Sequence, residues 1–462
     1  MAQPEAGMTA QAALGRNWDV AVIGGGVVGC AVARRFALEG AAVILLERAP
    51  DILAGASKGN SAILHTGFDA PPGSLELRCM QTGYREYLEI RERLNLPLLE
   101  TGAAVVAWSD EDEAKLDGIL AQAHENDVSD ARRIGRDELL AREPNLAPQA
   151  RAAVLVPGEH LIDPWSAPLA YISQALAEGA ACLRNAPVTA GSFDGASWRL
   201  ETPRGRITAG HVVNCAGLHG DELERSLLGE CDFEIRPRKG QFVVFDKAAA
   251  ALLRTIILPV PTERSKGVVI CRTIFGNVLV GPTAEEQPER DRANLDRRML
   301  EELHASALRM IPGLAPIPVT ATYAGLRPAT ERKEYRIGVK ERNWISVGGI
   351  RSTGLTAALG IAQHVVALYD GAKTATRAEP QWPRMPNLAD HLPRDWQQPG
   401  HGEIVCHCEL VTRREIEQAL TGPLPAGDPG GLKRRTRAGM GRCQGFYCSA
   451  HVAAISAGRL HG

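Results

Sequence analysis

Four cysteines near the C-terminus form the pattern with the clearest chemistry in this chain. Cys406 and Cys408 flank His407, and Cys443 and Cys448 follow after an insert long enough for a helix. Two close pairs of thiols predict a site in which four sulfur atoms hold a metal ion or an iron-sulfur cluster, since tetrahedral sulfur ligation suits zinc as well as iron. A Rieske-type centre needs two histidine ligands, and only His407 is interleaved. Spacing alone therefore predicts four-cysteine ligation, with zinc and an iron-sulfur cluster as alternatives.

A glycine-rich segment near the N-terminus indicates a dinucleotide site. Gly24, Gly26 and Gly29 follow an apolar segment and begin a helical pattern. Glycines in such a turn permit a tight bend, close approach of the backbone to a pyrophosphate, and close packing of helix on strand. Glu47 ends the next apolar segment, where a carboxylate accepts hydrogen bonds from ribose hydroxyls. These residues do not distinguish FAD from NAD, but a redox cofactor at one end of the chain favours a redox centre at the other.

The sequence patterns of the helices and strands that must position these residues predict an α/β fold. One βαβ unit of a Rossmann-like domain is expected from the strand, helix and strand patterns of residues 20–23, 27–38 and 42–46. A mixed or antiparallel second sheet, the floor of a substrate domain, is expected from residues 235–245 and from a hairpin over residues 268–280. Near the C-terminus, Thr412 and Glu415 form a capping box, which predicts a helix just after the first cysteine pair. The C-terminal module is therefore expected to be small and helical.

Composition excludes several classes of function. The 462 residues are 45% hydrophobic and carry a net charge of -2, so nothing favours binding to nucleic acid. No apolar run is long enough to span a bilayer, and the first 17 residues lack the pattern of a signal peptide. We expect a cytoplasmic protein, at most peripheral at the inner face of a membrane, and an oligomer is compatible with this composition. Six isolated cysteines are expected to be buried thiols: Cys30, Cys79, Cys182, Cys215, Cys231 and Cys271.

Five segments in combination resemble the D-amino-acid-oxidase superfamily of FAD proteins, in particular its branch with glycerol-3-phosphate dehydrogenase and L-2-hydroxyglutarate dehydrogenase. They are the glycine segment up to Glu47, the loop and helix start at 57–75, the strand end at 212–217, the Tyr-Ala-Gly-Leu-Arg-Pro run at 323–328, and the glycine-rich loop at 348–356. The resemblance covers about residues 17–370. Residues 405–455 resemble the BFD-like 2Fe-2S domain found behind the anaerobic type of glycerol-3-phosphate dehydrogenase A subunit.

The resemblance implies FAD and a 2Fe-2S cluster as cofactors, and it assigns residues to both. Besides the three fingerprint glycines and Glu47, the expected FAD contacts are Ser57, Asn60, Ser61, the backbone of Val188, Ala216, Gly217, Gly349, Gly354, Leu355 and Thr356. Amides of the loop at 348–356 would face the flavin pyrimidine oxygen and stabilise negative charge there on reduction. Each of Ser57, Asn60 and Ser61 is equally suited to be a cap or turn residue. The four cysteines are the implied cluster ligands.

Three further residues are candidates for catalysis. His65 follows the flavin-side loop, and a histidine there can take the hydroxyl proton of a substrate near neutral pH or pack beside the flavin. Arg327 and Arg351 are expected to anchor a carboxylate or phosphate, because a guanidinium fork matches the geometry of those groups. At Arg351 the chain departs from family members that carry a lysine or glutamate. A second cation favours a doubly charged substrate such as glycerol 3-phosphate or 2-hydroxyglutarate, or a sugar acid.

These signals divide the chain into four parts. We expect a disordered arm (1–16), an FAD-dependent oxidoreductase body (17–375), a Pro-rich linker (376–400) and a BFD-like 2Fe-2S domain (401–462). Within the body, the expected FAD-binding parts are 17–75, 150–225 and 320–370, and the expected substrate domain comprises 76–149 and 226–319.

The expected function is that of an FAD-dependent dehydrogenase. It would oxidise a small anionic hydroxy substrate and pass electrons singly through the cluster to an external acceptor, which is a quinone, an electron-transfer protein or a partner subunit. An amine or amino-acid dehydrogenase on the same fold and a non-enzymatic iron-sulfur carrier or sensor are the alternatives. Basic residues near the cysteines either compensate the cluster charge or dock an acidic partner; they are Lys433, Arg434, Arg435, Arg437 and Arg442.

Overall fold

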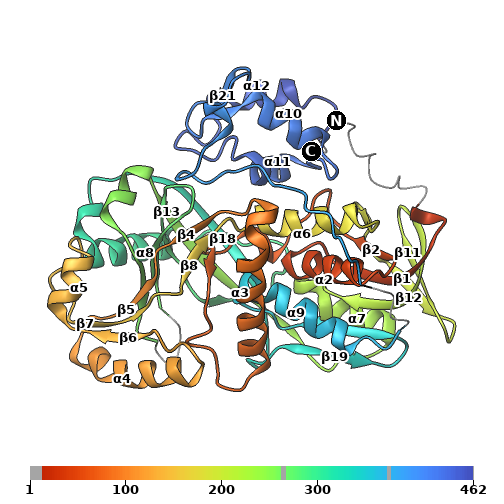
Figure 1. The fold of residues 1–462 in the computed structure, drawn as a ribbon, viewed down its shortest axis with the longest axis horizontal. Coiled ribbons are helices and arrows are strands. Elements are labelled where there is room, and N and C mark those ends of the chain that lie inside the picture. Colours follow the sequence, from red (N-terminus) through yellow and green to blue (C-terminus); the bar gives the residue numbers. More distant parts are fainter. Residues whose placement is uncertain (1–12, 262–266, 372–375, 461–462) are drawn as a thin grey trace.

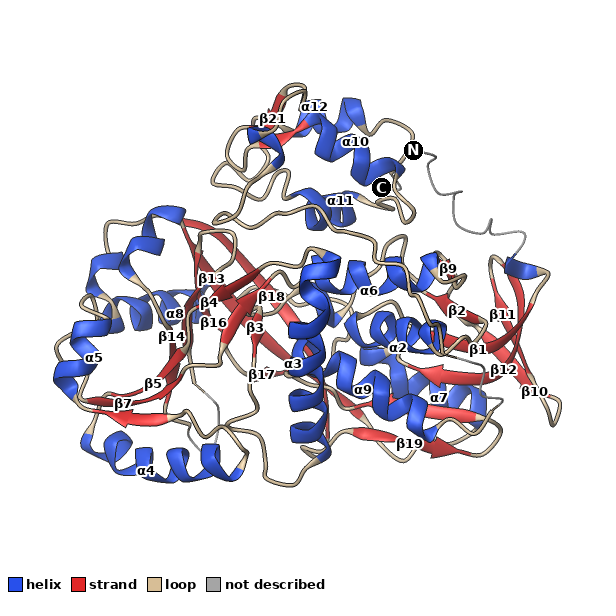
Figure 2. Cartoon of the chain, in the orientation of Figure 1, coloured by secondary structure: helices blue, strands red, loops and turns tan. Residues whose placement is uncertain are grey.

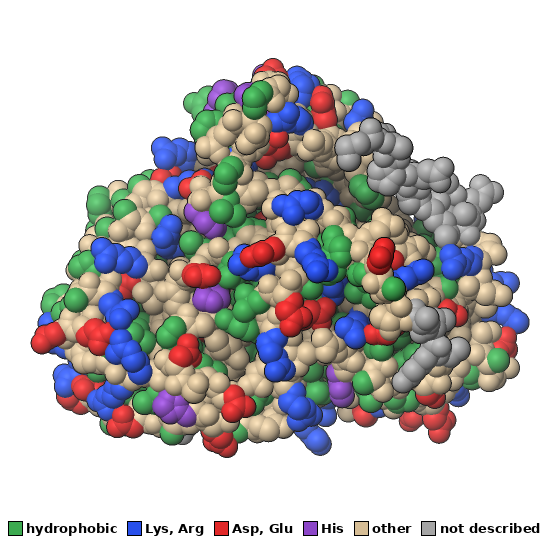
Figure 3. Space-filling view, viewed as in Figure 1, with side chains coloured by type: hydrophobic (Ala, Val, Ile, Leu, Met, Phe, Trp, Pro, Cys, Tyr) green, Lys and Arg blue, Asp and Glu red, His purple; other side chains and the backbone are tan. Residues whose placement is uncertain are grey.

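The computed structural model describes residues 13–261, 267–371 and 376–460 of the chain. Two lobes lie side by side, each built on one large sheet, and a small C-terminal module covers one end of both (Figure 1). No helix in the described part of the chain combines the length and apolarity needed to cross a bilayer. On the face drawn in Figure 3, basic and acidic side chains are interspersed.

The first lobe is built on an eight-stranded sheet with a parallel centre. Its strands are β10 (Ala190–Phe193), β11 (Trp198–Thr202), β12 (Gly205–Asn214), β1 (Asn17–Ile23), β2 (Val43–Leu46) and β9 (Ala181–Leu183) in spatial order, with β20 (Trp344–Gly348) beside β12 and β19 (Arg336–Lys340) beside β20. Apolar runs such as that of β2, buried on both faces, are typical of parallel strands covered by helices. The predicted βαβ unit is therefore confirmed.

Four helices share one core with this sheet. They are α2 (Val27–Leu38), α3 (Leu75–Leu94), α6 (Ser166–Ala177) and α9 (Gly354–Leu368); α7 (Gly220–Leu228) lies against β20 and β10. Helix α3 starts where the Ser74 hydroxyl accepts a hydrogen bond from the backbone N–H of Leu77, 3.1 Å away, and ends at Asn95 with φ 58°. Helices α3 and α9 pack closely because Gly83 and Gly360 meet backbone of the facing helix, where a Cβ would collide. This contact fixes the N-terminus of α9 beside the central cavity.

The second lobe is built on a nine-stranded, largely antiparallel sheet. In spatial order its strands are β17 (Glu285–Glu286), β13 (Ile235–Phe245), β16 (Val278–Gly281), β15 (Val269–Arg272), β14 (Ile256–Pro259), β5 (Ala103–Ala107), β7 (Ala152–Val156) and β6 (Arg132–Ile134), and β18 (Val319–Thr330) pairs with β13. Helices α4 (Asp110–Glu125), α5 (Arg136–Arg142) and α8 (Arg297–Met310) pack on it. The predicted strand 235–245 and the hairpin over 268–280 are both present.

A three-stranded sheet joins the lobes. Its strands are β3 (Ile63–Leu64), β8 (His160–Ile162) and β4 (Leu98–Glu100). Antiparallel pairing of β3 with β8 brings the residue after β3, His65, beside the residue before β8, Glu159. Short 3-10 turns complete the two lobes: η1 (Ala56–Lys58), η2 (Gly217–His219), η3 (Lys247–Leu252) and η4 (Pro312–Leu314).

The C-terminal module is small and mostly helical, as predicted (Figure 2). Its elements are β21 (Ile404–Cys406), β22 (Val411–Thr412), α10 (Arg413–Thr421), α11 (Pro429–Thr436) and α12 (Ser449–Ile455), with η5 (Asp395–Gln397) just before them. The predicted capping box is present: the Thr412 hydroxyl accepts from the Glu415 N–H at 3.1 Å, and the Glu415 carboxylate accepts from the Thr412 N–H at 2.8 Å. All ten cysteines are free; of the six isolated ones, Cys182 and Cys231 are half-buried and the others are buried.

The structure differs from the expected division of the body at three places. Helix α3 packs in the core of the first lobe, whereas β7 and β18 belong to the sheet of the second. At the N-terminal end of the described chain, Ala13 is 2% exposed and its carbonyl accepts a hydrogen bond from the Trp18 indole at 3.1 Å. Residues 13–16 are thus not a disordered arm; the rest of the expected arm, 1–12, and the end of the body, 372–375, lie outside the described residues.

The Pro-rich segment 376–400 is not a free linker. Backbone N–H groups of Arg377 and Asp390 donate to carbonyls of the two lobes, at 2.8 and 3.0 Å, and Leu388 and Ala389 are buried. The segment has no regular strand pairing, as its composition predicts, but hydrogen bonds and apolar contacts hold it along the body. The C-terminal module is therefore attached by an ordered strap.

Candidate active site and cysteine cluster

A cavity of about 1750 Å³ lies where the two lobes meet. Residues from β1, β2, the loop before β3, β18 and the start of α9 all line it, so both large sheets contribute to its wall. Clefts of this kind, at the C-terminal edge of a parallel sheet, are the usual cofactor and substrate sites of α/β proteins.

At one end of the cavity, the glycine segment leaves room for a phosphate group. Gly24 has φ +111°, and a Cβ there would collide with the carbonyl of Cys215. Gly26 lines the cavity at the start of α2, whose first N–H, that of Val27, donates to the Ser57 hydroxyl at 3.0 Å. Gly29 does not line the cavity; a Cβ there would collide with backbone, so it serves the packing of helix on strand. Bare backbone at a helix N-terminus fits a pyrophosphate.

The buried carboxylate of Glu47 closes the same end. Its two oxygens accept hydrogen bonds from the backbone N–H groups of Gly25 at 2.6 Å and Ala49 at 2.8 Å. Burial raises the pKa of Glu47, although these two bonds oppose the shift. Other predicted FAD residues on this wall are Val188, Ala216 and Gly217. The carboxylate thus holds the glycine turn and still faces the cavity.

The wall next to the glycine segment combines the loop before β3 with the start of α9. Ser57, Asn60, Ser61, Gly349, Gly354 and Leu355 all line the cavity. The Asn60 side chain serves a local turn, because its amide donates to the Ser57 carbonyl at 3.2 Å and its oxygen accepts from the Ala62 N–H at 2.8 Å. Thr356 is not on the lining; its hydroxyl accepts from the His65 N–H at 3.0 Å and donates to the Ile63 carbonyl at 3.3 Å. It ties α9 to β3.

His65 lines the cavity and is paired with a buried carboxylate. Its Nδ1 lies 2.7 Å from Oε2 of Glu159, whose side chain is fully buried. The other oxygen of Glu159 accepts hydrogen bonds from the N–H and the hydroxyl of Thr66, at 2.6 and 2.8 Å. The carboxylate is therefore fixed at both oxygens and can hold the imidazole ring in one orientation.

Three arginines converge on the cavity from the second lobe and from the loop before α9. Arg238 on β13 and Arg327 on β18 are directly opposite each other, and Arg351 is close enough to act on Arg327. The pKa of Arg327 falls to about 10, first because of burial and then because of the positive charges of Arg238 and Arg351. Like charges opposite each other destabilise a sheet. A glycine at position 240 leaves room for the Arg327 side chain, because a Cβ on Gly240 would lie 2.6 Å from Nη2 of Arg327.

Arg327, Arg351 and His65, which the sequence predicts as site residues, line the cavity, whereas Arg238 on the same wall and Glu159 behind His65 were not predicted. Arg238 lies in the strand predicted as the floor of the substrate domain, and a charged residue in that strand was the available signal. Glu159 follows a Pro-Gly turn and is joined to His65 only by the pairing of β3 with β8. A contact between residues 94 positions apart gave no local signal.

The four cysteines of the C-terminal module lie together as two pairs, Cys408 with Cys443 and Cys406 with Cys448. Burial raises the pKa of Cys408, with Cys443 and Cys406 adding to the shift, and burial followed by Cys406 raises that of Cys448 to about 11. Within the described residues, the ligand atoms of Glu224, Cys231 and Asp232 make the only trio lying mutually within 4.8 Å. No three of the four cluster sulfurs are that close.

This pairing fits two iron ions better than one zinc. A single tetrahedral zinc with bonds of about 2.3 Å would hold all four sulfurs within about 4 Å of one another. Backbone N–H groups of Tyr447, Gly445 and Phe446 face Cys443 and lower its pKa. Hydrogen bonds to the sulfurs of this kind stabilise the thiolate form that binds iron.

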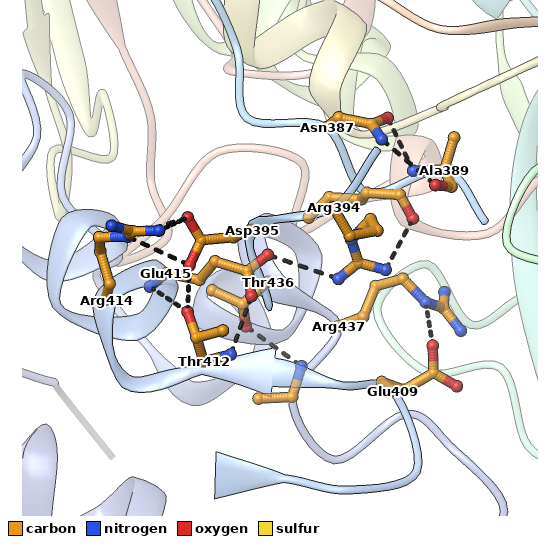
Figure 4. Close-up of polar contacts among 12 residues, drawn as sticks. Asn387, Ala389, Arg394, Asp395, Glu409, Thr412, Arg414, Glu415, Thr436 and Arg437 are labelled. Carbon is orange, nitrogen blue, oxygen red and sulfur yellow. Dashed lines mark hydrogen bonds and ion pairs between the residues drawn. The ribbon is translucent and has the colours of Figure 1, made fainter. Parts of the chain in front are cut away.

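Ion pairs hold the module on the body and on the strap, and Figure 4 shows those with the strap. Arg394 of the strap lies 3.4 Å from Glu415, with both side chains at least 94% buried. The Thr412 hydroxyl donates to Asp395 at 2.6 Å. Four of the five basic residues near the cysteines are engaged within the chain: Arg434 with the Ile52 carbonyl, Arg435 with Asp51, Arg437 with Glu409, and Arg442 with Asp246. Arg434, Arg435 and Arg442 contact the body, whereas the ion pair of Arg437 lies within the module.

A nucleotide cavity between two lobes and a four-cysteine module fixed beside it define a redox protein with two centres. Comparison with known proteins identifies the family: residues 19–368 match the FAD dependent oxidoreductase family and residues 404–457 match the BFD-like 2Fe-2S binding domain. The chain belongs to the FAD dependent oxidoreductase family, as a flavoenzyme with a C-terminal 2Fe-2S domain. Its cofactors are FAD and a 2Fe-2S cluster, which corrects the zinc, NAD and non-enzymatic alternatives.

Relatives resemble the chain over most of its length. A glycerol 3-phosphate dehydrogenase of Caloramator mitchellensis is 31% identical over 96% of this chain and 94% of the relative. An L-2-hydroxyglutarate dehydrogenase of Indibacter alkaliphilus is 29% identical over 58% of this chain and 68% of the relative. Among solved structures, the L-alpha-glycerophosphate oxidase of Mycoplasma pneumoniae with FAD bound has a TM-score of 0.73, at 26% identity over 79% of this chain and 97% of that chain.

Proposed function

We propose that the protein is a glycerol 3-phosphate dehydrogenase that passes electrons through its cluster to an acceptor outside the chain. The choice of substrate rests on the convergence of Arg238, Arg327 and Arg351 on the cavity. Half-buried like charges opposite each other are unfavourable in the substrate-free protein, and a doubly charged anion would neutralise them. The name of the relative that matches across both domains supports the same substrate.

Each group of residues that lines the cavity has a separate role in this proposal. Bare backbone at Gly24 and Gly26 would receive the pyrophosphate of FAD, with Glu47 at the ribose and the start of α9 at the flavin ring. When bound, FAD accepts a hydride from the carbon that bears the substrate hydroxyl. The arginines orient the phosphate, which fixes the distance between that carbon and the cofactor.

His65 would take the hydroxyl proton at Nε2 while Glu159 holds Nδ1. A carboxylate 2.7 Å from Nδ1 favours the tautomer that carries its proton on Nδ1, and it stabilises the imidazolium that forms when a second proton arrives. Because Glu159 is itself held by Thr66, the ring does not need to reorient during the reaction. Proton transfer and phosphate binding thus come from different lobes that meet at the cavity.

L-2-Hydroxyglutarate is the second candidate substrate, because it also carries two negative charges and a dehydrogenase of that substrate is similar in sequence. An anaerobic absorbance experiment separates the candidates. Purified holoenzyme is mixed with glycerol 3-phosphate, with each enantiomer of 2-hydroxyglutarate, with sugar acids, or with amino acids, and flavin bleaching is followed. Rapid bleaching by glycerol 3-phosphate alone is expected. Faster bleaching by 2-hydroxyglutarate or by an amino acid would overturn the proposal.

A further inference from the structure

A series of contacts links the cavity wall to Glu409, the residue that follows Cys408. It begins at Trp165, which follows the cavity-lining residue Pro164. The Trp165 indole N–H donates to the carbonyl of Lys58, 3.3 Å away, just before Gly59 and Asn60 of the cavity wall. Asp163, fully buried, accepts from the Trp165 N–H at 2.9 Å. The indole is thus fixed against the flavin-side loop.

The next contact is between two aromatic rings. Trp165 stacks on Phe275, with ring centroids 5.5 Å apart and planes at 12°. Phe275 is 5% exposed at the turn between β15 and β16, where Leu388 and Ala389 of the strap pack against it. Stacked rings at this separation have no room for water between them. The strap therefore covers Phe275, whereas Trp165 is half-buried.

Arg437 of the module completes the series. Its guanidinium carbon lies 4.0 Å from the centre of the Phe275 ring, and its Nε donates to Oε2 of Glu409 at 2.7 Å. Glu409 follows Cys408 in the chain, and its pair with Arg437 appears in Figure 4. Both side chains are at least 95% buried.

The backbone at Arg437 indicates that its side chain is needed. Arg437 is the C-cap of α11 and has φ 66°, a left-handed conformation that favours glycine at helix ends. A non-glycine residue is strained in this conformation. Arg437 is buried, stacked on a ring and paired with the residue that follows Cys408. These contacts of its side chain explain why an arginine occupies this position.

We propose that Trp165, Phe275 and Arg437 form the path by which electrons cross from the flavin site to the cluster. The inference rests on the proposed function in that reduced FAD is the donor. Reduced flavin carries two electrons and each crossing moves one, reducing one ferric ion of the cluster to ferrous. Two crossings, with the external acceptor reoxidising the cluster between them, return the flavin to its oxidised form, and its protons pass to solvent. Electron tunnelling falls steeply across gaps, so packed rings and a buried guanidinium speed each crossing.

Two matched pairs of variants test the path. Phe275→Leu and Trp165→Leu keep an apolar side chain against the strap but remove the stack, whereas Phe275→Tyr and Trp165→Phe keep a ring. In anaerobic stopped-flow experiments on the holoenzyme, flavin bleaching and cluster bleaching are followed separately after addition of glycerol 3-phosphate. Reduction of the cluster is also followed by electron paramagnetic resonance. If no substrate reduces the flavin, illumination with EDTA supplies the electrons, so a wrong substrate does not hide the result.

The two leucine variants are expected to leave flavin bleaching unchanged and to slow cluster bleaching about tenfold or more, because a shorter side chain opens a gap in the stack. The aromatic variants are expected to match the unaltered protein. Hydrogen exchange over the strap and α11, measured with and without cofactors, should be equal in all variants. Cluster bleaching at the unaltered rate in both leucine variants would overturn the proposal, and so would equal slowing in the leucine and aromatic variants.

Discussion

Replacement of Arg238 by glutamine tests whether the three arginines are an anion site. Arg238 lies directly opposite Arg327, and its charge is one cause of the low pKa of Arg327, after burial. Arg236 is the matched control, because it lies two residues away on the same strand with 59% of its side chain exposed, 3.0 Å from Glu234. An exposed pair of this kind contributes little to stability.

The two effects of Arg238→Gln have opposite signs. Loss of a charge-assisted hydrogen bond to a phosphate costs about 1.5–3 kcal/mol of binding, which is roughly a 10- to 150-fold higher glycerol 3-phosphate concentration for half-maximal flavin bleaching. Removal of like-charge repulsion on Arg327 stabilises the substrate-free protein by up to about 1 kcal/mol. A variant that binds substrate worse while unfolding at a higher temperature is typical of a residue kept for function.

The assay combines an anaerobic titration of flavin absorbance with thermal unfolding in the absence of substrate. Arg236→Gln should change neither quantity. If Arg238→Gln and Arg236→Gln gave the same half-maximal concentration, the arginines would be structural and the anion site would be refuted.

Three further predictions follow from the contacts at the two centres. Glu159→Gln should slow flavin bleaching at saturating substrate by about 10- to 100-fold without altering the half-maximal concentration, because His65 loses its anionic partner; a shift in that concentration instead would place Glu159 in binding. Arg435→Met should lower the free energy of unfolding by about 3 kcal/mol, because the buried Asp51 loses its paired guanidinium and keeps Arg184, 3.6 Å away, and the N–H groups of Ile52 and Gly427. Arg435 depresses the pKa of Asp51 against the effect of burial, so this stabilisation should be complete above the unfolded pKa of about 3.9 and lost as pH falls through the lower folded value. Cys443→Ser should abolish the cluster signal and slow turnover with a one-electron acceptor, yet leave flavin bleaching intact; unchanged turnover would remove the relay.

Local sequence patterns predicted the helices, strands and turns well, because each of these patterns depends on residues that are close together in the chain. The capping box at Thr412, the end of α2 at Leu38 and the hairpin turn at Phe275 all follow from sequence within one or two turns. Residues joined across long separations were missed, because nothing local marks them. Glu159 reaches His65 only through β3 and β8, and Arg238 meets Arg327 only through the pairing of β13 with β18.

Domain boundaries were predicted less well, because packing rather than composition decides them. Helix α3 follows the first βαβ unit at a distance, yet Gly83 lets it pack against α9 of the same lobe. Strand β18 precedes the glycine-rich loop at 348–356 in the chain, yet its register with β13 places it in the other sheet. The contact of Gly59 with Gly325, where a Cβ on either would crowd backbone, then brings that strand against the loop before β3.

The strap has a consequence for how electrons reach the cluster. Its proline content predicts an extended segment, and it is extended, but hydrogen bonds to both lobes and the buried Arg394 pair with Glu415 hold it in place. A module on a free tether would have to find its docking site in each turnover, and its rate would depend on tether length. A module fixed by Asp51, Asp246 and the strap keeps one distance to the flavin site. The contacts around Phe275 would then be present in every turnover, so substitutions there should change the rate of a single crossing and not the fraction of docked molecules.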